Sequence, residues 1–159
     1  MPLLRATLSD LPNGCICLST AERQSLASKA RRNDGIGKEK MGKKPDIMAL
    51  EKCNGKLVEF LFAECSRVFC SATKKEEDEI KLWRELLDGS SYINSACRPI
   101  RNQFGVVGIQ VAGERIYLNV LMNDTNDGAA VGFSSSSSAN SLACLLWKGL
   151  LWFFGVLLE

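Results

Sequence analysis

The sequence predicts an α/β fold with a mixed, mainly antiparallel sheet of about four strands and two flanking helices. The first observation is a hairpin pattern: two apolar, β-prone runs at residues 47–50 and 57–63 flank the turn dipeptide Asn54-Gly55. The second is an amphipathic helix pattern at residues 73–88, directly after the hairpin. Strands that alternate with a helix in this way indicate a sheet covered by helices.

Each predicted strand follows from its pattern of apolar residues. The hairpin strands are apolar at successive positions, so we expect both of their faces to be buried. Glu59 interrupts this pattern. We therefore expect its carboxylate either to have a partner inside the protein or to lie at the edge of the sheet. Residues 104–111 and 115–122 are two further strands, and Gly113-Glu114 between them predicts a tight turn.

Two capping boxes, each a Ser or Thr followed three residues later by Glu, mark the expected helix starts. The first begins at Ser19 and predicts a surface helix to about residue 32. The second begins at Thr73 and predicts a helix to Asp88, before Gly89. The apolar stripe of this second helix consists of Ile80, Trp83 and Leu87, widened by Leu82 and Leu86.

The 159 residues form one ordinary domain with extensions. Residues 1–18 have no clear period and are expected to be loosely ordered, and residues 19–124 carry the α/β domain. A run of five serines marks residues 125–141 as a flexible linker. Residues 142–159 form an apolar C-terminal segment, in which residues 142–158 are apolar apart from Lys148. As a helix, this stretch would span roughly 25 Å, slightly less than a bilayer core of about 30 Å.

The cysteine and histidine content limits the kinds of catalytic and metal site that the chain can contain. The chain has seven cysteines, an odd number, and no evident signal peptide. We therefore expect reduced thiols and an intracellular location, in the cytoplasm or nucleus. The chain has no histidine, which excludes Ser–His and Cys–His nucleophile pairs, and the cysteine spacing does not match a zinc finger.

The positive charge of the chain is concentrated in one stretch. From Lys29 to Lys44 there are seven basic residues against two acidic ones, although the net charge of the whole chain is only +2. Such a stretch is expected to attract the phosphates of a nucleic acid. The alternative is a solvated basic loop with no partner.

Two carboxylates stand at the open end of the hairpin. Asp46 follows Pro45 just before the first strand, and Glu64 ends the second. They are neighbours in an antiparallel pair, where they would offer hard oxygen ligands to a divalent metal. They share a face only if they pair directly, which a two-residue turn at Asn54-Gly55 prevents unless a bulge follows.

Pro45-Asp46, followed by Glu64-Cys65-Ser66, resembles the motif of the PD-(D/E)XK nucleases. Residues 19–124 are also similar to an uncharacterised, repeat-expanded protein family of mucoromycete fungi, through the segments KKPDIM, AEC and KKEEDEIKLWRELLDG. The resemblance implies a restriction-endonuclease-like core in which Asp46 and Glu64 hold Mg²⁺. It also implies that Glu22, from an early helix, is a further acid of the site.

The chain departs from the motif in two places. Ser66 stands where the family has a lysine, and a hydroxyl supplies no positive charge. In the family a strand separates the first helix from the motif Asp, and residues 35–44 offer none. The candidate catalytic residues are therefore Asp46, Glu64, Ser66 and Glu22, and the lysines of the following helix that are candidates to replace the missing charge are Lys74, Lys75 and Lys81.

These departures predict a degenerate nuclease-like domain that is inactive or binds metal weakly, and that binds nucleic acid. One alternative is a non-catalytic protein-interaction module, in which Glu64 pairs with an arginine such as Arg67. Another is a membrane protein anchored by the tail at residues 142–158.

Overall fold

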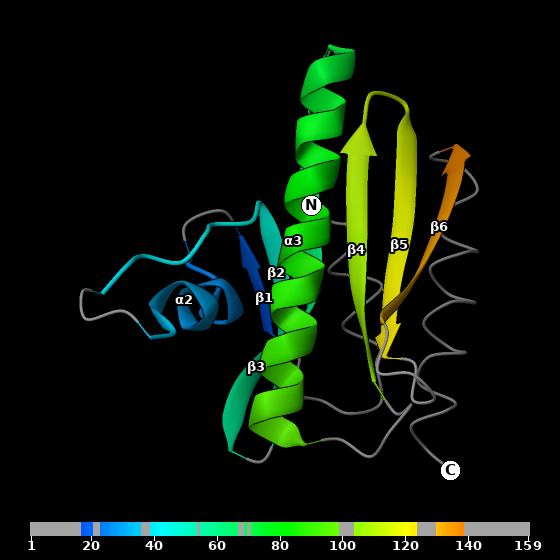
Figure 1. Ribbon diagram of the computed structural model, residues 1–159. Coiled ribbons are helices and arrows are strands. Elements are labelled where there is room, and N and C mark those ends of the chain that lie inside the picture. The colour runs from blue at the N-terminus through cyan, green and yellow to red at the C-terminus, as the bar shows by residue number, and fades with distance from the viewer. Residues whose placement is uncertain are drawn as a thin grey trace.

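The computed structural model describes residues 17–20, 23–35, 39–53, 55–66, 69, 71–98, 104–123 and 130–138. In these residues the chain is α/β, with a mixed six-stranded sheet packed against two helices (Figure 1). The strands lie in the order in which they occur along the chain. Every neighbouring pair is antiparallel except β3 and β4, which are parallel.

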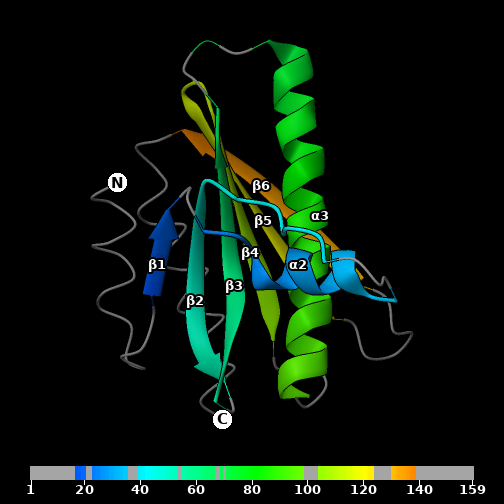
Figure 2. The same ribbon diagram turned by 90° about the vertical axis from the view of Figure 1, so that its left-hand side faces the viewer.

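The long helix is the connection that the parallel pair requires, because parallel strands cannot be joined by a tight turn. This helix, α3, leaves the end of β3 and returns the chain to the start of β4. Both helices lie on the same side of the sheet (Figure 2). The helices are α2 (Leu26–Asn33) and α3 (Ala72–Cys97), and the strands are β1 (Cys17–Thr20), β2 (Ile47–Cys53), β3 (Lys56–Cys65), β4 (Gly105–Ala112), β5 (Arg115–Asn123) and β6 (Ala130–Ser138).

The four predicted strands correspond to β2, β3, β4 and β5, and the structure adds one strand at each end. The serine run lies in β6, where Ser138 pairs with Arg115 and Ser134 with Asn119, so a flexible linker is the wrong description of these residues. The physical reason is that β5 offers backbone hydrogen-bonding groups to a neighbouring strand whatever side chains that strand carries.

The predicted start of the first helix is wrong. Ser19 lies in β1, where it pairs with Met48 of β2. The helix begins later, and its N-cap is Ser25, whose Oγ accepts a hydrogen bond from the backbone N–H of Ser28 at 3.0 Å. A capping pattern alone could not distinguish two serines that both precede short polar segments.

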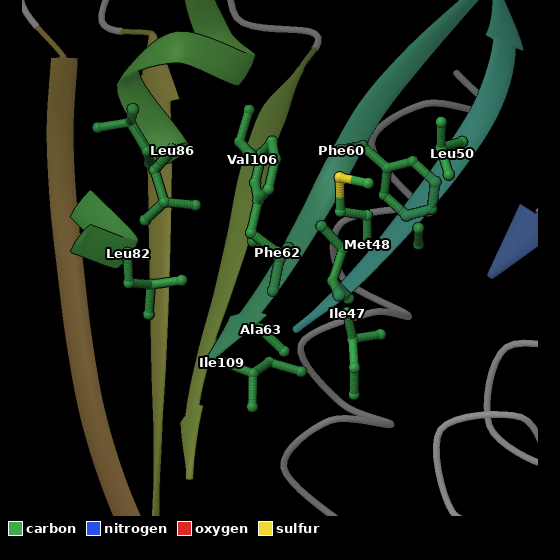
Figure 3. Packing of buried hydrophobic residues seen from close by; sticks show 14 of the residues in the cluster. Ile47, Met48, Leu50, Phe60, Phe62, Ala63, Leu82, Leu86, Val106 and Ile109 are labelled. Atoms are coloured by element: carbon green, nitrogen blue, oxygen red, sulfur yellow. The ribbon is translucent and has the colours of Figure 1, made fainter. Parts of the chain in front are cut away.

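The buried face of α3 differs from the predicted stripe. Ile80 and Leu87 are each 52% exposed, whereas Leu82 and Leu86 are fully buried against the sheet (Figure 3). The difference arises because acidic residues share the buried face, and the apolar pattern treats such residues as solvent-facing. The buried residues of α3 are Asp78, Leu82, Glu85, Leu86, Asp88, Gly89 and Ile93.

Two glycines allow α3 to lie close to the sheet. The helix continues past Gly89, where its end was predicted, and is capped by Arg98 in the left-handed conformation (φ 47°). A Cβ at Gly89 would lie 2.7 Å from Cε2 of Phe62, and a Cβ at Gly108 of β4 would lie 2.9 Å from Cδ1 of Leu86. Any side chain at either position would push the helix and the sheet apart.

Glu59 has the partner that its burial requires. Its carboxylate accepts hydrogen bonds from Ser25 Oγ at 2.7 Å, from the backbone N–H of Leu26 at 2.6 Å and from that of Ala27 at 3.1 Å. These N–H groups are free at a helix N-terminus, where the helix dipole also favours a negative charge. A carboxylate of β3 therefore fixes α2 to the sheet.

We predict that Glu59→Gln destabilises the domain by on the order of 2–3 kcal/mol, because an amide nitrogen replaces one of the two oxygens that together accept three hydrogen bonds at the start of α2. Chemical denaturation followed by circular dichroism measures this loss. Glu79→Gln, the same change at an exposed position of α3, is the control and should leave stability nearly unchanged. Equal stability of the two variants would contradict the structural role of Glu59.

Candidate functional site

The register of the hairpin decides whether Asp46 and Glu64 meet. The turn has two residues, because Cys53 pairs with Lys56. A bulge then follows: Ala49 pairs with Leu61 and Leu50 with Glu59, which leaves Phe60 as an extra residue in β3. Beyond the bulge Ile47 pairs with Ala63, and one further step along the same register places Asp46 opposite Glu64. The bulge therefore restores the pairing that a two-residue turn alone would prevent.

Asp46 and Glu64 thus stand side by side at the open end of the hairpin. The Asp46 carboxylate accepts a hydrogen bond from the backbone N–H of Cys65 at 2.8 Å. Glu64 is 3% exposed, and burial, followed by the charges of Asp46 and Asp78, raises its pKa against the opposing effect of Lys81. Burial, followed by the charges of Asp46 and Glu64, raises the pKa of the Cys65 thiol, which makes it a poor nucleophile at neutral pH.

A lysine of α3 supplies positive charge to this pair. Lys81 Nζ lies 2.6 Å from Oε1 of Glu64 and donates a hydrogen bond to Oε2 at 2.7 Å. Burial alone would lower the pKa of Lys81. The hydrogen bond from Lys81 to Glu64 and the charges of the surrounding carboxylates have the larger effect, so the pKa of Lys81 is raised. Of the three lysines considered from the sequence, Lys81 is the one that contacts Glu64.

A third carboxylate, which sequence reasoning missed, lies beside Glu64. Glu85 is one helical turn after Lys81 on α3 and is 2% exposed. No ordinary donor among the described residues reaches its carboxylate oxygens or Oε1 of Glu64, and the side chains of Glu85 and Glu64 hydrogen-bond to each other when Glu85 carries a proton. Burial, followed by the charge of Glu64, raises the pKa of Glu85 to about 9. The only signal in the sequence was its position, three residues from Leu82 and next to Leu86.

Ser66 and the other two candidate lysines are engaged elsewhere. Ser66 Oγ donates a hydrogen bond to Asp78 at 2.6 Å, and Lys74 pairs with the second oxygen of the same carboxylate. Although burial acts in the opposite direction, these two hydrogen bonds lower the pKa of Asp78. Lys75 Nζ donates a hydrogen bond to the Tyr117 hydroxyl at 2.6 Å. Ser66 is therefore a hydrogen-bonding neighbour of the site and does not supply its charge.

The basic stretch from Lys29 to Lys44 contributes several cations to contacts within the protein. Lys29 forms an ion pair with Glu39 at 2.5 Å, and Arg32 donates a hydrogen bond to the carbonyl of Met41 at 2.6 Å. Arg31 pairs with the buried carboxylate of Asp88 and so joins α2 to α3. Part of the positive charge predicted to face a nucleic acid therefore holds this loop and helix together.

Several sequence predictions concern residues outside the described part of the chain. These are Glu22, Arg67, the apolar tail at residues 142–158, and residues 1–16 of the N-terminal stretch that was expected to be loosely ordered. In the described residues, no helix is long and apolar enough to cross a membrane. Nor does the described part of the chain contain three or more His, Cys, Asp or Glu side chains already arranged around a metal position. No family model, curated protein or solved structure matches this chain.

We predict that the stability of the metal-free protein falls as pH rises from about 4.5 to about 9. The pKa of Glu85 is raised from its ordinary value of 4.5 to about 9 on folding, so in this interval the folded protein keeps a proton that the unfolded chain has released. The resulting slope is at most about 1.4 kcal/mol per pH unit for one group. Glu64 acts in the same direction because its pKa is also raised.

Denaturant unfolding at a series of pH values measures this slope. Glu85→Gln cannot titrate and should flatten the profile, whereas the exposed control Glu79→Gln should keep the wild-type slope. Identical slopes for the wild type and Glu85→Gln would show that Glu85 ionises normally in the folded state.

Proposed function

We propose that this chain is a degenerate nuclease-like domain of the PD-(D/E)XK type that binds a divalent cation weakly at Asp46 and Glu64 and binds nucleic acid. The proposal is carried by the bulged hairpin, which places the two carboxylates opposite each other with an ammonium group from α3 beside them. The mixed sheet, in which a helix follows the Glu64 strand and returns to a parallel neighbour, is compatible with a restriction-endonuclease-like core.

The donor set fits a hard cation in its chemistry. Asp46 and Glu64 offer carboxylate oxygens, the ligands that Mg²⁺ and Mn²⁺ prefer. When bound, such a cation neutralises phosphate charge and lowers the pKa of a coordinated water. Weak affinity follows from the present contacts, since Lys81 forms an ion pair with Glu64 and must withdraw before a cation binds there.

Lys81 has the charge that position 66 lacks. It reaches Glu64 from the neighbouring helix, and its side chain is 35% exposed, so it has access to a ligand in solution. A displaced Lys81 would be free to contact a phosphate oxygen next to the cation. Lys40 and Lys43, which are exposed in the basic stretch, are further candidates for contacts with a nucleic acid.

One observation favours the alternative of a non-catalytic interaction module. Ile80 and Leu87, seven residues apart on α3, are both exposed, and this spacing places them on one face of a helix. Contiguous exposed apolar surface marks contacts with other proteins, and these two residues are where such a surface on α3 would lie.

We predict that millimolar Mg²⁺ raises the melting temperature of the wild type slightly and that Asp46→Asn abolishes the shift, because binding to the folded state alone stabilises it. The same samples, incubated with DNA and RNA, should show no robust cleavage. Clear Mg²⁺-dependent cutting that is lost in both Asp46→Asn and Glu64→Gln would show an active nuclease. No Mg²⁺ shift in the wild type would contradict the metal site.

Lys81→Met should bind Mg²⁺ more tightly than the wild type, because the substitution removes the cation that competes for Glu64. Without metal this variant should be destabilised by roughly 3 kcal/mol, since a buried carboxylate loses its partner. Differential scanning fluorimetry against Mg²⁺ concentration compares it with Lys74→Met, which breaks the neighbouring pair with Asp78. An equal Mg²⁺ response in the two variants would mean that Lys81 does not guard the site.

A further inference from the structure

Two cations approach one neutral hydroxyl on the side of the sheet that carries the helices. Lys75 Nζ donates a hydrogen bond to the Tyr117 hydroxyl at 2.6 Å and lies 4.3 Å from the centre of the tyrosine ring. Arg115 is two residues before Tyr117 in β5, so both side chains point to the same face of the sheet. Lys75, and after it Arg115, lower the pKa of the Tyr117 hydroxyl although burial acts in the opposite direction, which indicates that the guanidinium lies near the same oxygen.

No carboxylate neutralises Lys75 or Arg115 among the described residues. Glu79 is one helical turn after Lys75, yet the Lys75 ammonium is directed at Tyr117 and forms no ion pair with this acid. Two like charges at one neutral oxygen repel each other, and an anion placed between them would remove the repulsion. Four other cations in the described part of the chain each have an acidic partner: Lys29 with Glu39, Arg31 with Asp88, Lys74 with Asp78 and Lys81 with Glu64.

The sheet holds these cations in a fixed place relative to Glu64. Glu64 of β3 pairs with Gln110 of β4, which in turn pairs with Tyr117 of β5. Gln110 is buried and donates a hydrogen bond from Nε2 to the backbone carbonyl of Lys75 at 2.8 Å, so it anchors the turn of α3 that carries the ammonium. Two strand spacings, about 10 Å, therefore separate Tyr117 from Glu64 across the sheet.

We propose that Lys75, Arg115 and Tyr117 form a phosphate-binding cluster, in which the two cations neutralise the phosphate charge and the phenol hydroxyl donates a hydrogen bond to a phosphate oxygen. Lysine, arginine and tyrosine are all residues that contact the phosphates of nucleic acids. Lys75 can keep its hydrogen bond to Tyr117 in the complex, because an ammonium has three donors. Arg115 is exposed and the other two residues are partly exposed, so a ligand in solution can reach all three.

The inference rests on the proposed nucleic-acid binding and names the residues that provide it, although free phosphate would bind by the same chemistry. Fluorescence anisotropy of labelled DNA and RNA oligonucleotides, titrated with the full chain at several salt concentrations, tests it. Lys75→Gln and Arg115→Gln should each weaken binding and reduce the slope of log affinity against log salt by about one unit, the change expected for one lost phosphate contact. Lys75→Arg, which keeps the charge, should retain most of the slope. Lys52→Gln, the same charge change at an exposed position of β2, is the matched control and should bind as the wild type does.

Free phosphate is tested through the phenol itself. Tyr92 is the only other tyrosine, so in Tyr92→Phe the ultraviolet absorbance of the phenolate reports Tyr117 alone. A phosphate bound at the cluster adds negative charge beside the hydroxyl and should raise the pKa of Tyr117, whereas chloride at the same ionic strength should not. Circular dichroism verifies that each variant is folded, and the exposed position of Arg115 keeps the test available if Lys75→Gln does not fold.

The outcomes separate this inference from the proposed function. A reduced slope in the charge-removing variants that Lys75→Arg restores supports the cluster, whether or not free phosphate also binds. If Lys75→Gln and Arg115→Gln keep the wild-type slope, the cluster does not contact the nucleic acid and the inference is overturned, while nucleic-acid binding by other residues stands. If the wild type binds no oligonucleotide but phosphate raises the pKa of Tyr117, the phosphate site stands and the nucleic-acid part of the proposed function is wrong. If neither ligand binds, both are wrong.

Discussion

The extra residue in β3, Phe60, determines which way the two buried glutamates of this strand, Glu59 and Glu64, point. Glu64 is five positions after Glu59, an odd number, so in a regular strand their side chains would point to opposite faces of the sheet. The bulge at Phe60 changes this parity and brings both to the helix side. Glu59 then caps α2, and Glu64 reaches Lys81 of α3. One irregularity thus attaches both helices to a single strand.

One face of α3 carries both the leucines that pack on the sheet and the charged side chains that approach Glu64. Leu82 and Leu86 pack over Gly108, and this close contact fixes the rotation of the helix about its axis. Lys81 and Glu85 occupy the adjacent positions, so the same contact directs them toward Glu64. The packing of Leu82 and Leu86 over Gly108 holds α3 in place. The fold can therefore tolerate the free-energy cost of burying Glu85 beside Glu64.

The sequence predicted the elements that rest on local patterns and missed those that rest on tertiary contacts. The hairpin, the pair β4 and β5 and the existence of α3 follow from apolar periodicity and turn dipeptides, and the structure confirms them. The edge strands β1 and β6 could not be predicted, because pairing with β2 and β5 forms them. Asp46 and Glu64 were found from their places at the strand ends. Glu85 was missed because hydrophobic periodicity assigns a glutamate to the solvent side.

The burial of Glu85 is informative because hydrophobic packing does not require it. The neighbouring leucines already supply the apolar contacts of α3, and an apolar residue at this position would avoid the free-energy cost of burying a carboxyl group. The domain keeps this cost next to Glu64, where a second carboxylate increases it further. Structure that is locally unfavourable yet held firmly by its surroundings is characteristic of a functional site. The group formed by Asp46, Glu64, Lys81 and Glu85 is therefore the part of this fold in which we propose that function resides.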